Sequence, residues 1–444
     1  MPSVPEIAWP SRKLHFIAIG GAGMSGLALV CRRLGAAVTG SDRASGGYLE
    51  RLRLAGIDAR VGHDPDAVPI ESEVVISTAI ADDNPELARA RERGQRVLHR
   101  GELLAELCAQ GRLIAVAGTH GKTTTSGMIT HAMRAIGADP AFFIGGELPG
   151  AGDDGSAANA GWGSGGWIVA EADESDGSFL RLRPEVAVVT NVELDHHARW
   201  SSRAELIRAF RDFARPATAL VLAEGPSLDA IAPADREVIR FDARFPGPAG
   251  LELSVPGTHN LLNARAALAA IELAGLDADA ATGALASFPG MVRRQELKGH
   301  CAGAAIYDDY AHHPTEVRAT LEALRELHPK RLIAVFQPHL FSRTKALASD
   351  FGAALAAADE VGVVDVYAAR EEPTGSLAGV SGLTVARATA EHANGKLVLW
   401  LGDRERAVRV LRPRLRDGDL LVTIGAGDIH KLAEELVEGV ESSQ

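Results

Sequence analysis

A glycine-rich turn between an apolar segment and a predicted helix constrains this chain more than any other feature. The turn reads Gly118-Thr119-His120-Gly121-Lys122-Thr123-Thr124, after the apolar residues 113–117 and before a helix predicted from about 123 to 136. Successive backbone N–H groups followed by a helix N-terminus can bind phosphates, and Lys122 adds a positive charge. A strand, a tight turn and a helix in this order indicate a βαβ unit, and therefore an α/β protein with a mainly parallel sheet.

The turn matches a shortened phosphate-loop pattern, G-x-x-G-K-T, because Val116 stands where the standard pattern has its first glycine. We predict that residues 118–124 bind ATP. The Thr123 hydroxyl is then expected on Mg²⁺, as is usual for the residue after the lysine in such loops. The alternative is a plain strand-to-helix turn in which the glycines and threonines serve only as turn and cap.

Carboxylates follow two strands that are predicted in the same region. Residues 167–170 run into the acidic segment 171–176, and residues 186–190 run into the segment 191–197, which contains His196. Open α/β sheets bind ligands at the carboxyl ends of their strands. Mg²⁺ prefers oxygen ligands and shares them with substrate phosphates, so a carboxylate here could complete the Thr123 site. A solvated acidic loop is the alternative interpretation.

A second glycine motif lies near the N-terminus. Gly21-Ala22-Gly23-Met24-Ser25-Gly26 follows a predicted strand over 15–20, and Ser41-Asp42 ends the next strand. This is the pattern of a dinucleotide-binding loop. Such a loop binds a pyrophosphate, which both NAD and UDP-sugars carry, so the motif alone leaves an oxidoreductase possible.

Strands and helices alternate in three successive series, which predicts three α/β domains. We place them at 1–111 (Rossmann-like), 112–296 (P-loop ATPase-like) and 297–444 (Rossmann-like). The segment 148–166, rich in Gly, Ala, Ser and Asp, is predicted to be a loop within the second domain.

Composition narrows the function classes. The chain has 444 residues, 46% of them hydrophobic, and a formal net charge of −12, which argues against nucleic-acid or membrane-surface partners. The three cysteines, Cys31, Cys108 and Cys301, lack the spacing of a disulfide framework or zinc site. No apolar run reaches membrane-spanning length and no leader is recognisable, so we expect a cytoplasmic protein.

Taken together, the motifs resemble those of the Mur ligase family, and their details are similar to its alanine-adding branch. The resemblance covers nearly the whole chain. The matching segments are, in chain order, HFIAIGGAGMSG, GSD, VAGTHGKTTT, EADESDGSFL, VTNVELDHH, GTHNLLNARAALA, DDYAHHPTE, FQPHLFSRT and DVYAARE.

The resemblance implies an ATP-dependent ligase. In that chemistry the lactyl carboxylate of UDP-N-acetylmuramate attacks the γ-phosphate of ATP to give an acyl phosphate. The amine of L-alanine then displaces phosphate and forms the amide. Phosphoryl transfer is catalysed mainly by positioning and charge neutralisation, so cations at the site are essential.

The resemblance also implies roles for particular residues. Those expected to be catalytic are Lys122, Glu171, His196, Arg293 and His313. Glu171 and His196 join Thr123 as the expected metal ligands, and His259, Asn260 and Asp308 are expected to contact ATP. Residues expected to contact the other substrates are Gly21, Ala22, Gly23, Ser41, Asp42, Tyr310, His312, His339 and Arg343.

Each of these residues also has a structural interpretation. Asn260 could cap a helix, Arg293 could lie on a solvated surface, and lone histidines are more often structural than functional. Two other protein classes also remain: an NAD-dependent oxidoreductase, and a non-catalytic sensor of nucleotide sugars. The sequence predicts no particular oligomeric state.

Overall fold

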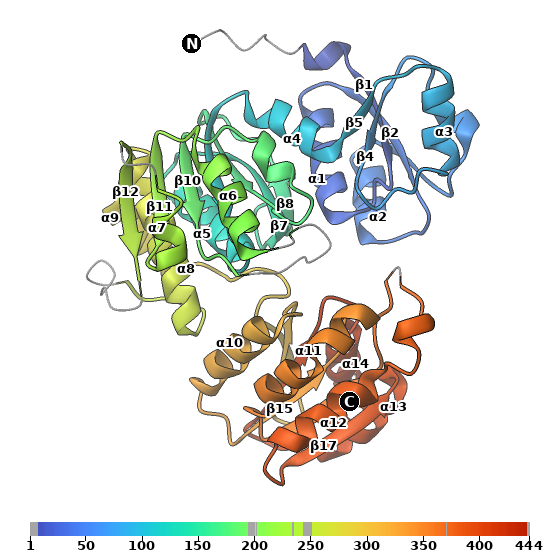
Figure 1. Cartoon of the computed structure of the whole chain (residues 1–444), viewed down its shortest axis with the longest axis vertical. Coiled ribbons are helices and arrows are strands. Elements are labelled where there is room, and N and C mark those ends of the chain that lie inside the picture. Colours follow the sequence, from blue (N-terminus) through green and yellow to red (C-terminus); the bar gives the residue numbers. More distant parts are fainter. Residues whose placement is uncertain are drawn as a thin grey trace. The chain divides into compact units, whose positions relative to one another are not determined.

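The computed structural model describes residues 8–193, 200, 202–232, 235–242, 251–369 and 371–441. The chain forms two compact units (Figure 1), and each is described by itself. One unit comprises Met1–Leu253 with Leu261–Pro289, and the other comprises Ser254–Asn260 with Gly290–Gln444. The first unit contains two sheets and the second contains one.

The first sheet has five parallel strands in the order β3-β2-β1-β4-β5. The strand order reverses between β1 and β4, which is where a doubly wound sheet opens a ligand crevice. The Rossmann-like architecture predicted here is confirmed. Its elements are η1 (Trp9–Ser11), β1 (Lys13–Ile17), α1 (Ala22–Arg33), β2 (Ala37–Asp42), α2 (Gly47–Leu54), β3 (Asp58–Val61), η2 (Pro65–Ala67), β4 (Glu73–Ile76), α3 (Pro85–Glu92), β5 (Val97–His99) and α4 (Arg100–Cys108).

The second sheet has seven strands in the order β12-β11-β10-β6-β9-β7-β8, with only β8 antiparallel to its neighbour among these strands. Strand β6, which leads into the phosphate loop, lies between β10 and β9. Its elements are β6 (Arg112–Ala117), α5 (Lys122–Ala135), β7 (Ala141–Leu148), β8 (Ala158–Gly161), β9 (Trp167–Glu171), η3 (Ser178–Arg181), β10 (Val186–Val189), α6 (Arg203–Ala214), β11 (Ala219–Ala223), α7 (Pro226–Asp229), β12 (Glu237–Phe241), α8 (Thr258–Leu273) and α9 (Ala278–Leu285).

The segment 148–166 is not a simple loop, so that prediction was wrong. It contains β8, which pairs antiparallel with β7 at the edge of the sheet. The sequence of β8, ANAG, lacks the β-branched and aromatic residues that signal a strand, and only pairing with β7 makes it one.

The first two sheets share one continuous apolar core. It includes Phe16 and Leu107 from the first sheet region and Leu113 and Phe210 from the second. Helix α1 lies against β7 and β8, and a Cβ placed on Gly26 would be 2.8 Å from the Cβ of Ala160. The predicted domain ranges 1–111, 112–296 and 297–444 stay predictions.

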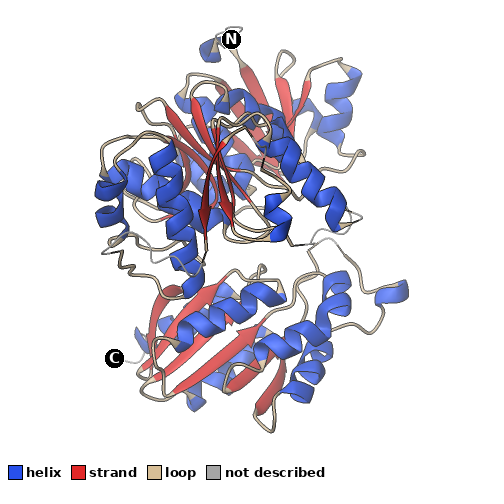
Figure 2. Cartoon of the chain, turned by 60° about the vertical axis from the view of Figure 1, so that its left-hand side comes forward, coloured by secondary structure: helices blue, strands red, loops and turns tan. Residues whose placement is uncertain are grey.

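The third sheet has six strands in the order β13-β14-β18-β15-β16-β17, with β13 antiparallel to β14. Helices cover both faces (Figure 2), with α10, α11 and α12 on one apolar cluster and α13 and α14 on the other. The elements are β13 (Glu296–Cys301), β14 (Ala304–Asp309), α10 (Pro314–Arg325), β15 (Arg331–Phe336), α11 (Phe341–Leu355), β16 (Glu360–Val364), η4 (Gly375–Leu377), α12 (Gly382–His392), β17 (Leu397–Gly402), α13 (Arg404–Leu411), η5 (Arg412–Arg414), β18 (Asp419–Ile424) and α14 (His430–Glu441).

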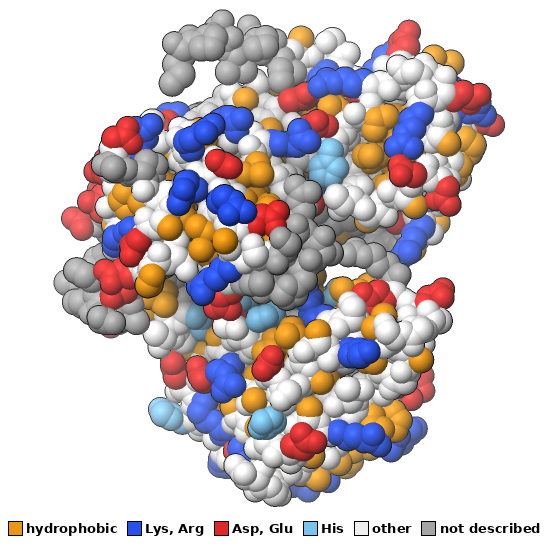
Figure 3. Space-filling view, viewed as in Figure 1, with side chains coloured by type: hydrophobic (Ala, Val, Ile, Leu, Met, Phe, Trp, Pro, Cys, Tyr) orange, Lys and Arg blue, Asp and Glu red, His pale blue; other side chains and the backbone are white. Residues whose placement is uncertain are grey.

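Among the described residues, no helix is long and apolar enough to cross a membrane. The three cysteines are buried thiols. On the face drawn in Figure 3, acidic and basic side chains are interspersed over each unit.

Candidate active site

The phosphate loop lies between β6 and α5, and its backbone requires two glycines. Gly118 has φ +140° and Gly121 has φ +81°, a region that favours glycine. A Cβ on Gly118 would overlap the Thr190 hydroxyl, and one on Gly121 would be 2.6 Å from Asn263 Oδ1. The two glycines therefore set the close approach of this loop to its neighbours.

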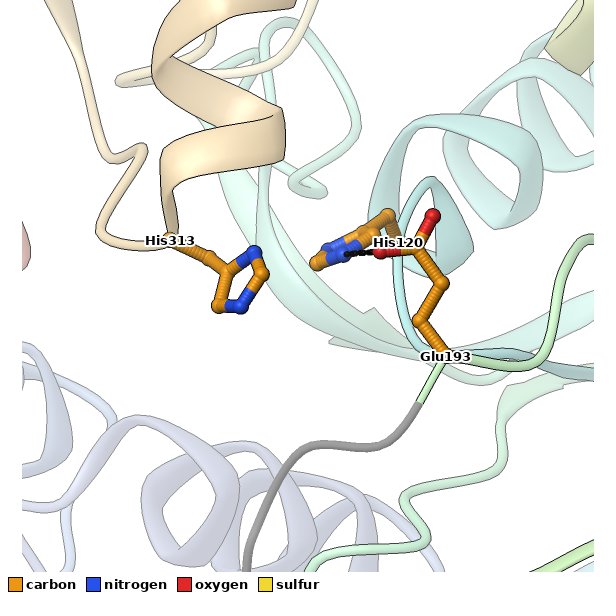
Figure 4. Close-up of side chains that lie close together, drawn as sticks. All are labelled: His120, Glu193 and His313. Atoms are coloured by element: carbon orange, nitrogen blue, oxygen red, sulfur yellow. Dashed lines mark ion pairs between the residues drawn. The ribbon is translucent and has the colours of Figure 1, made fainter. Parts of the chain in front are cut away.

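Residues that follow β10 hold the loop in place. The Thr119 hydroxyl donates to the Glu193 carbonyl (3.0 Å), and the Glu193 N–H donates back to that hydroxyl (2.9 Å). The His120 N–H donates to Asn191 Oδ1 at 2.8 Å. Figure 4 shows the ion pair between the His120 ring and the Glu193 carboxylate, 3.4 Å apart. The strand end predicted to reach the phosphate loop does reach it.

Lys122 is folded back over the loop and is paired with a buried carboxylate. Its Nζ lies 2.9 Å from Glu174 Oε2 and donates to the Gly118 carbonyl at 2.6 Å. Burial alone would lower the pKa of Lys122, but the carboxylates around it, Glu174 foremost, outweigh burial and raise it. Burial raises the pKa of Glu174 to about 7, against the attraction of Lys122. The lysine is therefore charged, and Glu174 is its nearest carboxylate.

Thr123 and Glu171 come together as predicted. The Thr123 hydroxyl donates to Glu171 Oε2 at 2.9 Å, and the Gly145 N–H donates to the same oxygen at 2.7 Å. Glu171 ends β9, next to β6, so a hydroxyl and a carboxylate meet at the edge of the sheet. His196, the third expected ligand, lies outside the described residues. Thr124 is half-buried in the first turn of α5.

The remaining acids of this strand end bind an arginine that sequence reasoning missed. Arg100 Nη2 lies 3.1 Å from Asp176 Oδ2 and 3.5 Å from Asp173 Oδ2. Arg100 directly follows β5 and begins α4. A charged residue at the carboxyl end of a strand was the signal that could have identified it, by the same rule that identified Glu171.

The first glycine loop is fixed by Asp42, whose Oδ2 accepts from the Gly20 N–H at 2.9 Å. Gly21 is the N-cap of α1, with Ala22 and Gly23 in its first turn. Ser41 is buried beneath the loop, where its hydroxyl donates to Glu86 Oε2 at 2.5 Å. Its predicted contact with a substrate stays a prediction.

In the C-terminal unit, Arg293 and Asp308 bind each other. Arg293 Nε donates to Asp308 Oδ2 (2.9 Å), and Thr423 donates to the other carboxylate oxygen (2.6 Å). The Arg293 guanidinium also donates to the carbonyls of Gly425 and Gly427. The expected catalytic role of Arg293 and the expected contact of Asp308 with ATP would require these pairings to rearrange, and both stay predictions.

Aromatic rings from three loops form a row in the same unit. Ring centroids are 5.5 Å apart between Tyr310 and His312, 6.2 Å between His312 and His339, and 5.8 Å between His339 and Tyr367. Burial lowers the pKa of His312. Tyr367 was not predicted, although it lies in the DVYAARE segment. His313 caps α10, accepting from the Thr315 N–H, and Arg343 is half-buried in the first turn of α11.

His259 and Asn260 begin α8 and contact the same glutamine. His259 Nε2 lies 3.2 Å from Gln295 Nε2, and Asn260 Nδ2 lies 3.3 Å from Gln295 Oε1. Burial lowers the pKa of His259 to about 4, so the ring is neutral at pH 7. Because the Gln295 amide nitrogen can only donate, His259 Nε2 is the acceptor in this contact, and the proton of the neutral ring lies on Nδ1.

Comparison with known proteins defines the class. The chain matches the family models "Mur ligase family, catalytic domain" over residues 13–112 and "Mur ligase, glutamate ligase domain" over residues 293–427. The chain belongs to the Mur ligase family. The family resemblance and the α/β fold with three sheets are thereby confirmed, and membership of a ligase family removes the support for an oxidoreductase.

Within that family, the chain is similar to curated UDP-N-acetylmuramate–L-alanine ligases. It is 46% identical to the enzyme of Kineococcus radiotolerans, over 96% of this chain and 95% of that protein. It is 43% identical to the enzyme of Renibacterium salmoninarum, over 96% of both.

Solved structures with a similar fold belong to two kinds of ligase. The crystal structure of UDP-N-acetylmuramate-alanine ligase from Thermotoga maritima is 28% identical, with a TM-score of 0.82 over 97% of this chain and all of that one. A murein peptide ligase from Psychrobacter arcticus is 25% identical, with a TM-score of 0.70 over 97% of this chain and 99% of that one.

Proposed function

We propose that this chain is an ATP-dependent ligase that joins L-alanine to the lactyl carboxylate of UDP-N-acetylmuramate, in the cytoplasmic synthesis of peptidoglycan precursors. The observation that carries the proposal is the grouping of Lys122, Thr123 and Glu171 at one sheet edge. This grouping occurs in a chain that aligns over almost its whole length with alanine-adding relatives.

The reaction has two steps. A lactyl carboxylate oxygen forms a bond to the γ-phosphorus of ATP while the bond from that phosphorus to its bridging oxygen breaks, releasing ADP. The uncharged amine of L-alanine then bonds to the carbonyl carbon of the acyl phosphate, inorganic phosphate leaves, and the amine loses a proton.

Lys122 has the central role in the first step. When Lys122 exchanges Glu174 for the γ-phosphate, its charge balances the negative charge that spreads over the phosphoryl oxygens. The N-terminus of α5 holds the other phosphates, because the Thr119 and His120 N–H groups already donate to Asn191.

The oxygen donors at the sheet edge fit Mg²⁺. Thr123 and Glu171 supply a hydroxyl and a carboxylate, the ligand types that this ion prefers beside phosphates. When bound, Mg²⁺ would neutralise phosphate charge. We therefore expect Glu171→Gln to raise the Mg²⁺ concentration needed for half-maximal activity roughly tenfold or more. Titration of activity with Mg²⁺ tests this, and an unchanged midpoint would remove Glu171 from the metal site.

The test of function is phosphate release from ATP and Mg²⁺ in the presence of UDP-N-acetylmuramate, with and without L-alanine. We expect release to require both substrates and to be lost in Lys122→Ala. A protein that binds the nucleotide sugar tightly but releases no phosphate with any amino acid would instead be a sensor.

A further inference from the structure

The first glycine loop lacks a cation of its own. Residues 18–26 read AIGGAGMSG, and no charged side chain occurs among them. A diphosphate carries at least two negative charges, which the backbone N–H groups of a helix N-terminus offset only in part. A cation from elsewhere in the fold would offset the remaining charge if it lay beside this loop.

Arg100 occupies that position. A Cβ on Gly23 would lie 3.2 Å from Arg100 Nη1, so the lack of a side chain at this glycine leaves room for the guanidinium beside the loop. Arg100 Nη1 donates to no described residue, whereas Nη2 faces Asp173 and Asp176. One edge of the guanidinium is thus held by carboxylates, and the other is directed at the glycine loop.

Local structure fixes the arginine in this orientation. Arg100 is the first residue of α4, which begins with a capping box: His99 Nδ1 accepts from the Gly101 N–H, and Glu102 accepts from the His99 N–H at 2.8 Å. The Asp176 side chain is 6% exposed, so this carboxylate has little freedom to move and holds Arg100 Nη2 in place. Because the side chain is held before a ligand arrives, little conformational entropy is lost on binding.

The glycine loop is anchored to the same framework. Asn159 in β8 donates to the Ala22 carbonyl at 2.6 Å, and its side chain is buried. Loop, arginine and acidic strand end are therefore parts of one compact unit, and the position of Arg100 relative to the loop does not depend on the other unit.

We propose that Arg100 binds the diphosphate of the nucleotide sugar at the first glycine loop, with Asp173 and Asp176 as its positioning residues. The inference rests on the proposed function, which supplies the nucleoside diphosphate. A guanidinium suits two phosphate oxygens because it can donate two parallel hydrogen bonds. The same arginine links the nucleotide-sugar loop to the strand end that carries Glu171.

The experiment measures the binding of UDP, uridine and ADP by calorimetry to the full chain and to Arg100→Gln and Arg100→Lys. We expect Arg100→Gln to weaken UDP binding about tenfold or more, with uridine and ADP binding unchanged, and Arg100→Lys to restore part of the loss. In turnover, the KM for UDP-N-acetylmuramate should rise while kcat and the KM for ATP stay constant.

The matched control is Arg181→Gln. Arg181 lies in η3 and pairs with Glu102 of α4 at 3.0 Å, so its loss removes a nearby cation that does not face the glycine loop. We expect UDP binding to be unchanged in this variant. Equal losses of UDP and uridine binding in Arg100→Gln, or an unchanged affinity for UDP, would overturn the role of Arg100. A wild-type chain that binds no UDP would overturn the proposed function itself.

Discussion

The two glycine loops of the first unit occupy equivalent places between a strand and a helix, but they differ in where their charged groups come from. Each follows a central parallel strand and leads into a helix of twelve or more residues. The loop after β6 contains Lys122 and is surrounded by Glu171 and Glu174. The loop after β1 contains no charge and takes Asp42 and Arg100 from other strands and helices.

We relate this difference in charge to two tasks, binding a phosphate and transferring one. A loop that only holds a diphosphate can use backbone donors and a cation fixed at its side. A loop that transfers a phosphoryl group needs a charge that can follow the reacting atoms, and that charge needs a counter-ion when no nucleotide is bound. The predictions below test this separation, from the largest expected effect to the smallest.

Lys122→Ala should lower kcat on the order of a thousandfold, because no other charge within the loop can follow the γ-phosphate. The affinity for UDP should not change, since the first loop does not use this lysine. Phosphate release and calorimetry measure the two effects. A parallel loss of UDP binding would show that the loops do not act separately.

Gly118→Ala should be far more damaging than Gly21→Ala. Gly118 has φ +140° and no space for a Cβ, whereas Gly21 has φ −69° and its nearest neighbour would be 3.5 Å away. We expect a loss of about 2–3 kcal/mol for Gly118→Ala and less than about 1 kcal/mol for Gly21→Ala. Thermal unfolding measures both. Equal losses would mean that the phosphate loop is not the more tightly constrained of the two.

Glu174→Gln should remove a pH dependence of stability. The pKa of Glu174 is about 7 in the folded chain, against an ordinary value of 4.5, so between these values the folded state binds a proton that the unfolded state has lost. Stability should therefore fall as pH rises from 4.5 to 7, by on the order of 1–3 kcal/mol, and the variant should lack this contribution.

The comparison is made by unfolding at pH 5 and pH 7.5, roughly the ends of that interval. Glu102→Gln is a suitable control because Glu102 is a partly exposed carboxylate of α4. The same pH profile in wild type and Glu174→Gln would contradict the assignment.

Asp42→Asn should have the smallest effect. It weakens one hydrogen bond to the Gly20 N–H, and so should raise the KM for UDP-N-acetylmuramate roughly threefold while leaving the KM for ATP unchanged. Initial rates at varied concentrations of each substrate decide this. A change in the KM for ATP would show that the second loop depends on Asp42.

The sequence predicted the parts of the site that lie close together along the chain or follow from strand order. The phosphate loop, the Thr123–Glu171 contact and the approach of residues 190–193 all follow from parallel strands that end at one edge. The sequence did not predict which of the four acids of segment 171–176 binds which partner. The turn after β9 determines that Glu174 is the carboxylate that pairs with Lys122.

Pairings between distant segments were also beyond sequence reasoning. Arg100 precedes its partners Asp173 and Asp176 by more than seventy residues, and no local pattern connects them. Arg293 was expected to be catalytic and Asp308 to contact ATP, and the structure shows that the two side chains form an ion pair with each other. The sequence alone does not show whether two charged side chains that could each bind a ligand form an ion pair with each other.

Because the first two sheets share one apolar core, the region of the first sheet cannot be separated from the second without exposing apolar surface. Gly26 of α1 packs against Ala160, and the Asn159 side chain donates to the Ala22 carbonyl. The region of the first sheet, which contains the first glycine loop, is therefore covered on this side by β8 of the second sheet. A fragment that ends at residue 111 should expose that apolar face and aggregate. In evolution, such a module could be exchanged between enzymes only together with the edge strand β8 that covers it.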